Sequence, residues 1–104
     1  MDVHLRPEAV DDIYRAAQFL NNKSDGWGDH FVARIQEDLV GLRTTAGSHG
    51  TRFGLGCAFS RKFPFAIYYR AEGGTAVVYA ILSCRQSTGV QRSIIRGRSG
   101  PGND

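Results

Sequence analysis

Cationic side chains are the residues of this sequence with the clearest capacity for binding chemistry, and they are concentrated in its second half. Residues 52–104 contain eight Lys and Arg against two Asp and Glu, whereas residues 1–51 contain five against eight. Guanidinium and ammonium groups bind phosphates and carboxylates through charge-assisted hydrogen bonds. The asymmetry indicates either a face directed at a polyanion or an acidic protein partner, or a face that only water contacts.

Residues that usually supply acid–base or metal chemistry are scattered. His4, His30 and His49 belong to no motif that would place one of them as a general base. Cys57 and Cys84 lie in apolar stretches without CxxC spacing, which predicts buried reduced thiols rather than a zinc site or a disulfide. The sequence contains no P-loop or nucleotide fingerprint, so we expect no cofactor and no metal.

Length and composition predict one folded domain. The chain has 104 residues, of which 41% are hydrophobic and 22% are charged, as is ordinary for a globular protein. It has no apolar run long enough for a membrane span and no signal-peptide pattern. We therefore expect a cytoplasmic protein with a single domain at residues 1–96 and a flexible tail at residues 97–104.

The first half predicts a strand and two antiparallel helices. A short strand at 2–6 ends at Pro7, a residue that suits the first turn of a helix. An apolar stripe at helical spacing follows it. After the turn-forming run at 21–28, a second stripe extends from Phe31 to Leu42.

The second half predicts three antiparallel strands at 57–63, 65–71 and 76–84, with a hairpin turn at EGGT. A glycine-rich loop at 44–56 connects them to the helices. The predicted fold is therefore α+β: an N-terminal strand, then an antiparallel helical hairpin packed on an antiparallel sheet that the three C-terminal strands complete. The other face of the sheet is expected to be open and to carry function, with one further helical turn near residues 90–95.

Four blocks of the sequence stand out, in this order: LRPEAVDDI at 5–13, GWGDHFVARI at 26–35, RKFPFAIYYRAEG at 61–73 and VVYAILSCR at 77–85. Together they resemble the corresponding blocks of the RelE/ParE superfamily, which comprises toxins of bacterial type II toxin-antitoxin pairs. The resemblance implies a RelE/ParE-like fold and a growth-inhibiting protein, of the kind associated with plasmid stabilisation. A cognate antitoxin would neutralise it by wrapping a helical or extended segment around it.

Two modes of action occur in that superfamily. Some members cut mRNA on the ribosome without a metal, and others inhibit DNA gyrase by binding. Cleavage through the 2′-hydroxyl of RNA needs a general base, a general acid and cations, and arginine can supply only the cations.

Arg85 matches the terminal arginine of the family and is the best-supported functional residue. Ser83 stands where many relatives have histidine, and Gln86 replaces a frequent second arginine. Ala66 stands where the family's nucleases have a phosphate-binding arginine. The strand that carries lysines in those nucleases ends here in Arg61 and Lys62, and no Tyr or His in the C-terminal segment is available as a base.

Strand alternation places Tyr68 and Arg70 on the face expected to be open. There they would extend a basic patch, although for each residue taken alone a half-buried tyrosine or a solvated arginine is the favoured interpretation. The predicted target- or RNA-binding residues are Arg61, Lys62, Tyr68, Arg70 and Arg85. If the protein is a ribonuclease, the predicted catalytic residues are Arg61, Lys62 and Arg85.

The missing arginine and the missing base favour a toxin that acts by non-catalytic binding, in the manner of ParE with a gyrase-type target. The first alternative is a RelE-like endoribonuclease that acts on mRNA at the ribosome. The second is a non-toxic interaction module derived from the family. In both toxin hypotheses, ParE-like and RelE-like, the expected partner is an antitoxin, with which the chain would form a hetero-oligomer.

Overall fold

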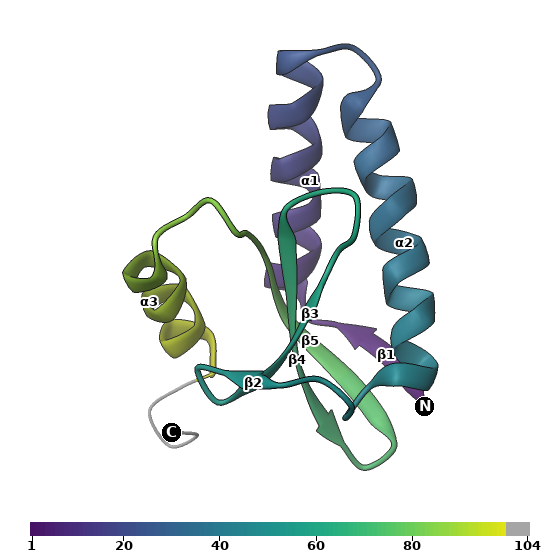
Figure 1. Cartoon of the computed structure of the whole chain (residues 1–104), viewed down its shortest axis with the longest axis vertical. Helices are drawn as coiled ribbons and strands as arrows, with labels where there is room; N and C mark the ends of the chain where they lie inside the picture. Colours follow the sequence, from purple (N-terminus) through teal and green to yellow (C-terminus); the bar gives the residue numbers. More distant parts are fainter. Residues whose placement is uncertain (100–104) are drawn as a thin grey trace.

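The computed structural model describes residues 1–99, and Figure 1 shows a helical hairpin standing on a sheet, with a third helix set apart from the hairpin. The elements in chain order are β1 (Asp2–Leu5), α1 (Pro7–Lys23), α2 (Trp27–Thr45), β2 (Thr51–Arg52), β3 (Leu55–Phe59), β4 (Phe65–Glu72), β5 (Thr75–Ser83) and α3 (Thr88–Ser99).

The helical hairpin follows from local sequence signals. Pro7 begins α1, and the carboxylate of Glu8 lies in its first turn, at the positive end of the helix dipole. At the tip of the hairpin, Gly28 packs against the backbone of α1, where any Cβ would collide with Ala17 and Asn21. The Gly28 N–H donates to Asn21 Oδ1 at 2.8 Å, which fixes the start of α2.

No helix within residues 1–99 is both long and apolar enough to cross a membrane.

The five strands form one sheet in the order β1-β5-β4-β3-β2. The three strands expected from the second half pair antiparallel, as predicted, and the short β2 extends the sheet beyond β3. β1 pairs in parallel with β5, so the sheet is mixed. The predicted strand at 57–63 stops at Phe59, because residues 60–64 turn the chain into β4.

A β-bulge in β5 sets which side chains face each side of the sheet. Tyr68 pairs with Ala80 and Tyr69 with Val78, so Tyr79 is the extra residue. A bulge leaves neighbouring residues on the same side of a strand. Tyr79 and Ala80 therefore both face away from the helical hairpin.

The main core lies between the helical hairpin and the sheet. Phe31 and Ile35 of α2 are fully buried there against Ile67 and Tyr69 of β4. This is the face that alternation in β4 predicts to be core.

The other face of the sheet is not open, and this corrects the sequence-based expectation. α3 lies across it, and Ile95 packs with Leu55, Ala66 and Leu82 in a second core. The segment expected to form one helical turn is a helix of 12 residues. Because α3 removes this apolar surface from water, the sheet has a core on both sides.

An ion pair between Asp12 and Arg98 joins α3 to α1. Arg98 donates to both carboxylate oxygens, at 2.6 and 2.9 Å, and also to the Tyr79 carbonyl. The Asp12 carboxylate accepts a further bond from the Ile81 N–H at 2.9 Å. Of the tail predicted at 97–104, residues 97–99 belong to α3, and the rest lies outside the described residues.

Candidate functional site

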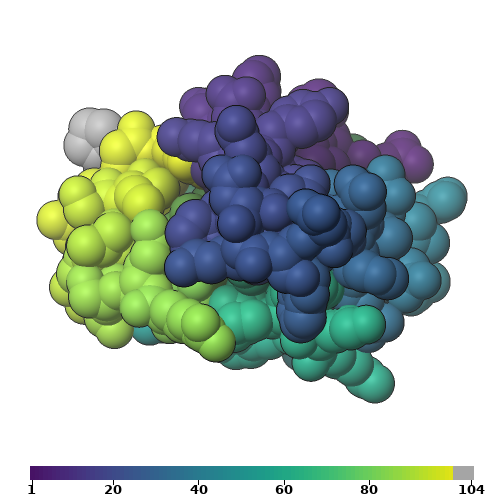
Figure 2. All heavy atoms as spheres, turned by 90° about the horizontal axis from the view of Figure 1, so that it is seen from above, coloured from purple at the N-terminus to yellow at the C-terminus, as the bar shows by residue number. Residues whose placement is uncertain are grey.

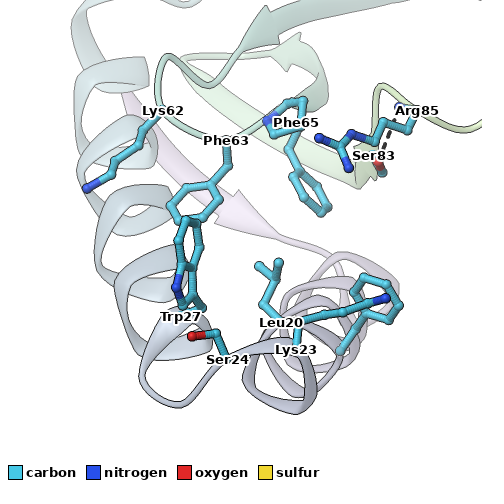
Figure 3. Close-up of a pocket in the computed structure, with 11 residues that line it drawn as sticks. Leu20, Lys23, Ser24, Trp27, Lys62, Phe63, Phe65, Ser83 and Arg85 are labelled. Carbon is cyan, nitrogen blue, oxygen red and sulfur yellow. Dashed lines mark hydrogen bonds between the residues drawn. The ribbon is translucent and has the colours of Figure 1, made fainter.

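Arg85 lies in the turn after β5, which two hydrogen bonds hold. The Cys84 N–H donates to the Pro64 carbonyl at 2.7 Å, and the Arg85 N–H donates to Ser83 Oγ at 3.2 Å. The side chain is exposed. In Figure 3 its guanidinium extends toward Phe65, at one side of a pocket.

This pocket, the hairpin groove, is a cavity of about 690 Å³ between the tip of the helical hairpin and the turn after β3. Phe63 and Phe65 form part of its wall, and Trp27 packs edge-on against Phe63 with ring centroids 6.0 Å apart. Trp27 is 49% exposed and Phe19 is 60% exposed. The residues that line the hairpin groove are Phe19, Leu20, Lys23, Ser24, Trp27, Lys62, Phe63, Pro64, Phe65, Ser83 and Arg85.

A second cavity of about 650 Å³, the helix groove, lies between α1 and α3. It shares four lining residues with the hairpin groove, Phe19, Phe65, Ser83 and Arg85, so the two form one continuous surface. Figure 2 views the molecule along the hairpin and shows the yellow-green residues of α3 on one side of the purple and blue hairpin. Exposed aromatic side chains joined to a basic rim are typical of a protein-binding surface.

The structure separates the cations that the sequence predicts as a patch. Lys62 lines the hairpin groove across from Arg85, and its side chain points away from the pocket (Figure 3). Arg61, its neighbour in the chain, instead lines a different cavity beside Asp38 and His49. Only Lys62 and Arg85 of the predicted set border one groove.

Tyr68 is fully buried beneath α3, so the expectation that it lies on an open face is wrong. Its hydroxyl donates to Gln91 Oε1 at 2.7 Å, and Arg52 donates to that hydroxyl at 3.4 Å. Burial raises the pKa of Tyr68 to about 12. The phenol is therefore protonated at neutral pH and already bonded.

Arg70 is part of a separate surface network. Its guanidinium donates to the Tyr79 hydroxyl at 3.2 Å, and that hydroxyl donates to Glu72 at 3.1 Å. The carbon Cζ of Arg70 also lies 5.2 Å from the centre of the Tyr79 ring. Arg70 lines neither groove.

His49 and the two thiols also have defined positions. The Tyr69 hydroxyl accepts the Gly47 N–H at 2.9 Å and lies 2.6 Å from His49 Nδ1, so this histidine fastens the loop after α2 to the sheet. Cys57 is buried as expected, whereas Cys84 is exposed. Desolvation raises the pKa of both thiols, so neither is an activated nucleophile.

Comparison with solved structures identifies the fold. A chain from the chromosomal ParDE TA system of P. aeruginosa superposes with a TM-score of 0.69 at 17% identity, over 78% of this chain and 92% of that chain. The predicted RelE/ParE resemblance is thereby confirmed at the level of the fold. No protein-family model and no curated protein sequence matches the chain.

Sequence reasoning missed the residues that attach α3. Gln91, Ile95 and Ser99 form the buried stripe of this helix, and two of the three are polar. Only one of these three buried positions is apolar, so the stripe itself gives little indication that the helix covers a sheet. The spacing of four residues from Gln91 to Ile95 and again to Ser99 was the available signal.

Proposed function

We propose that this chain is the toxin of a bacterial type II toxin-antitoxin pair and that it acts by binding its target, as a ParE-like toxin with a gyrase-type target does. The observation that carries the proposal is the fold shared with the ParDE chain. Sequence identity of 17% leaves the function to be argued from this chain's own residues.

The arrangement of side chains favours binding over RNA cleavage. Cleavage needs a base within reach of the phosphate that the cations hold. Tyr68 is buried and protonated, and His49 is bonded to Tyr69. Among the described residues that line the two grooves, the one carboxylate belongs to Asp12, which Arg98 neutralises.

The grooves fit the proposed antitoxin partner. An amphipathic helix or an extended segment could insert apolar side chains between Phe19 and Trp27. Acidic residues of that segment would face Lys23 and Arg85 on the rim. Because disordered antitoxin segments gain structure on binding, such capture covers a large surface.

Induced expression in bacteria, followed in parallel for mRNA integrity and DNA supercoiling, tests this function. We expect growth arrest with altered supercoiling and intact mRNA, relieved by co-expression of the antitoxin encoded beside the toxin. Codon-positioned cleavage of mRNA, abolished by Lys62→Ala or Arg61→Ala in a folded protein, would establish the ribonuclease alternative instead. A chain that is harmless at high expression and recovers no partner would be the derived interaction module.

A further inference from the structure

A cluster of arginines surrounds Phe53, at the turn between β2 and β3. The guanidinium carbons of Arg52 and Arg92 lie 4.9 and 5.5 Å from the centre of the Phe53 ring. Arg96 lines the same depression, a cavity of about 300 Å³ that also includes Gly54 and Ser99. We name Arg52, Phe53, Arg92 and Arg96 the arginine cluster.

The arginine cluster faces away from the grooves. Ile94 and Arg98 of α3 border the helix groove, whereas Arg92 and Arg96 border the depression. At about 100° per residue, these two pairs lie on opposite sides of α3. The depression shares no lining residue with either groove.

The cluster carries positive charge that the described part of the chain does not neutralise. Arg98 pairs with Asp12, but no carboxylate within residues 1–99 lies within ion-pair distance of Arg52, Arg92 or Arg96. Arg92 and Arg96 are four residues apart on a helix, a spacing at which like charges repel. The helix dipole favours Arg96 in the last turn of α3, yet it accounts for neither Arg92 nor Arg52.

The backbone at Phe53 is also unusual. Phe53 has φ 57°, and Gly54 has φ 81°, so both central residues of the hairpin turn adopt left-handed conformations. Such turns favour Asn-Gly, and a bulky residue in this region is disfavoured. The sequence nevertheless keeps an aromatic ring here, which serves as a platform for the guanidinium groups of Arg52 and Arg92.

These features favour a phosphate-rich ligand over an acidic peptide. Peptide partners bind largely through apolar anchors, and the depression offers only the Phe53 side chain, which the arginines approach. Binding to nucleic acid depends mainly on cations that contact phosphates, and the guanidinium fork matches phosphate oxygens.

We propose that the arginine cluster binds the phosphodiester backbone of a nucleic acid, at a surface separate from the grooves. Arg92 and Arg96 would each contact a phosphate, and Arg52 would add a third cation that Thr88 and Tyr68 hold in place. This inference does not rest on the proposed toxin function.

Fluorescence anisotropy with labelled oligonucleotides, over a series of salt concentrations, tests the site. Arg92→Ala with Arg96→Ala should weaken binding at least about tenfold at low salt. The slope of log affinity against log salt should become shallower by about 1.4 for a single strand or about 1.8 for a duplex. The size of this change, with the affinities for single-stranded RNA, single-stranded DNA and duplex, identifies the source of the phosphates.

Arg43→Ala is the matched control, since Arg43 is an exposed helical arginine outside the cluster. It should leave both the affinity and the salt slope nearly unchanged, and circular dichroism should show all variants folded. Equal losses from Arg43→Ala and from the cluster variants would overturn the proposal. So would undetectable binding of oligonucleotides at low salt, or competition by a polyglutamate peptide as effective as that by a nucleic acid of equal charge.

Discussion

At the scale of single residues, Arg85 combines exposure with a fixed backbone. Its guanidinium makes no hydrogen bond within residues 1–99, while its N–H is held by Ser83. Arg85→Ala should therefore weaken partner binding by about 1.5–3 kcal/mol, the usual contribution of a charge-assisted contact, and reduce growth inhibition with it. A titration with the partner measures the affinity, and a thermal melt measures the stability of the variant.

The stability of the Arg85→Ala variant should change by less than about 0.5 kcal/mol, as for other surface substitutions. Loss of its cooperative melt would show that Arg85 is structural. Arg43→Ala, which removes the same charge far from the grooves, should change neither quantity.

Tyr68 predicts a dependence of stability on alkaline pH. Its pKa in the folded state is about 12 against an ordinary value of 10.0, because burial disfavours the phenolate. Between these values only the unfolded chain loses the proton, so the free energy of unfolding should fall as pH rises from 10 to 12. The full loss is about 3 kcal/mol.

Denaturant unfolding of the wild type and Tyr68→Phe at pH 9, 10, 11 and 12 isolates this contribution, since all other groups are common to both. Tyr68→Phe is expected to be less stable at pH 9, because Gln91 Oε1 loses its donor. The gap should narrow toward pH 12. Parallel curves would mean that the folded protein does not protect this hydroxyl.

At the scale of elements, the Asp12–Arg98 pair makes α3 part of the domain. Both side chains are largely buried, with 7% of Asp12 and 15% of Arg98 exposed. Asp12→Ala leaves the Arg98 charge and the Ile81 N–H without this partner and should cost about 3–5 kcal/mol in the free energy of unfolding. Urea unfolding followed by circular dichroism provides the measurement.

Arg15→Ala is the control for this pair. Arg15 approaches the same carboxylate at 3.4 Å, but its side chain is 71% exposed. Removing it should cost less than about 1 kcal/mol, as is usual for surface ion pairs. If both substitutions cost the same, the bond between α1 and α3 does not stabilise the domain.

Most elements follow from sequence patterns, and the exceptions have physical causes. The helical hairpin and β4 carry strong periodicity, so their positions were predictable. The pairing of Asp12 with Arg98 joins residues far apart in the chain, and nothing local indicates it. The buried stripe of α3 includes the polar residues Gln91 and Ser99, so the sequence predicted only one helical turn there. The sheet face beneath α3 was therefore expected to be open and Tyr68 to be accessible.

At the scale of the whole molecule, the proposed function implies that a partner binds in the two grooves. Phe19 lines both grooves and is 60% exposed, so Phe19→Ser should weaken partner binding by about 2 kcal/mol or more with little effect on folding. Isothermal titration calorimetry against the co-purified partner measures the loss. Val40, 64% exposed on α2 and outside the grooves, is the matched control.

Val40→Ser should leave partner binding unchanged. An equal loss from both substitutions would place the interface elsewhere on the helices. A partner that binds Phe19→Ser with wild-type affinity would show that the grooves are not the docking surface.

The parallel pairing of β1 with β5 has a consequence for biosynthesis. β1 can join the sheet only after β5 exists, and Asp12 meets Arg98 only when α3 has formed. Contacts of such long sequence separation slow folding and delay it until nearly the whole chain has been made. A ribosome that stalls before residue 75 has been made therefore holds a nascent chain whose first strand has no strand to pair with and whose Asp12 has no Arg98.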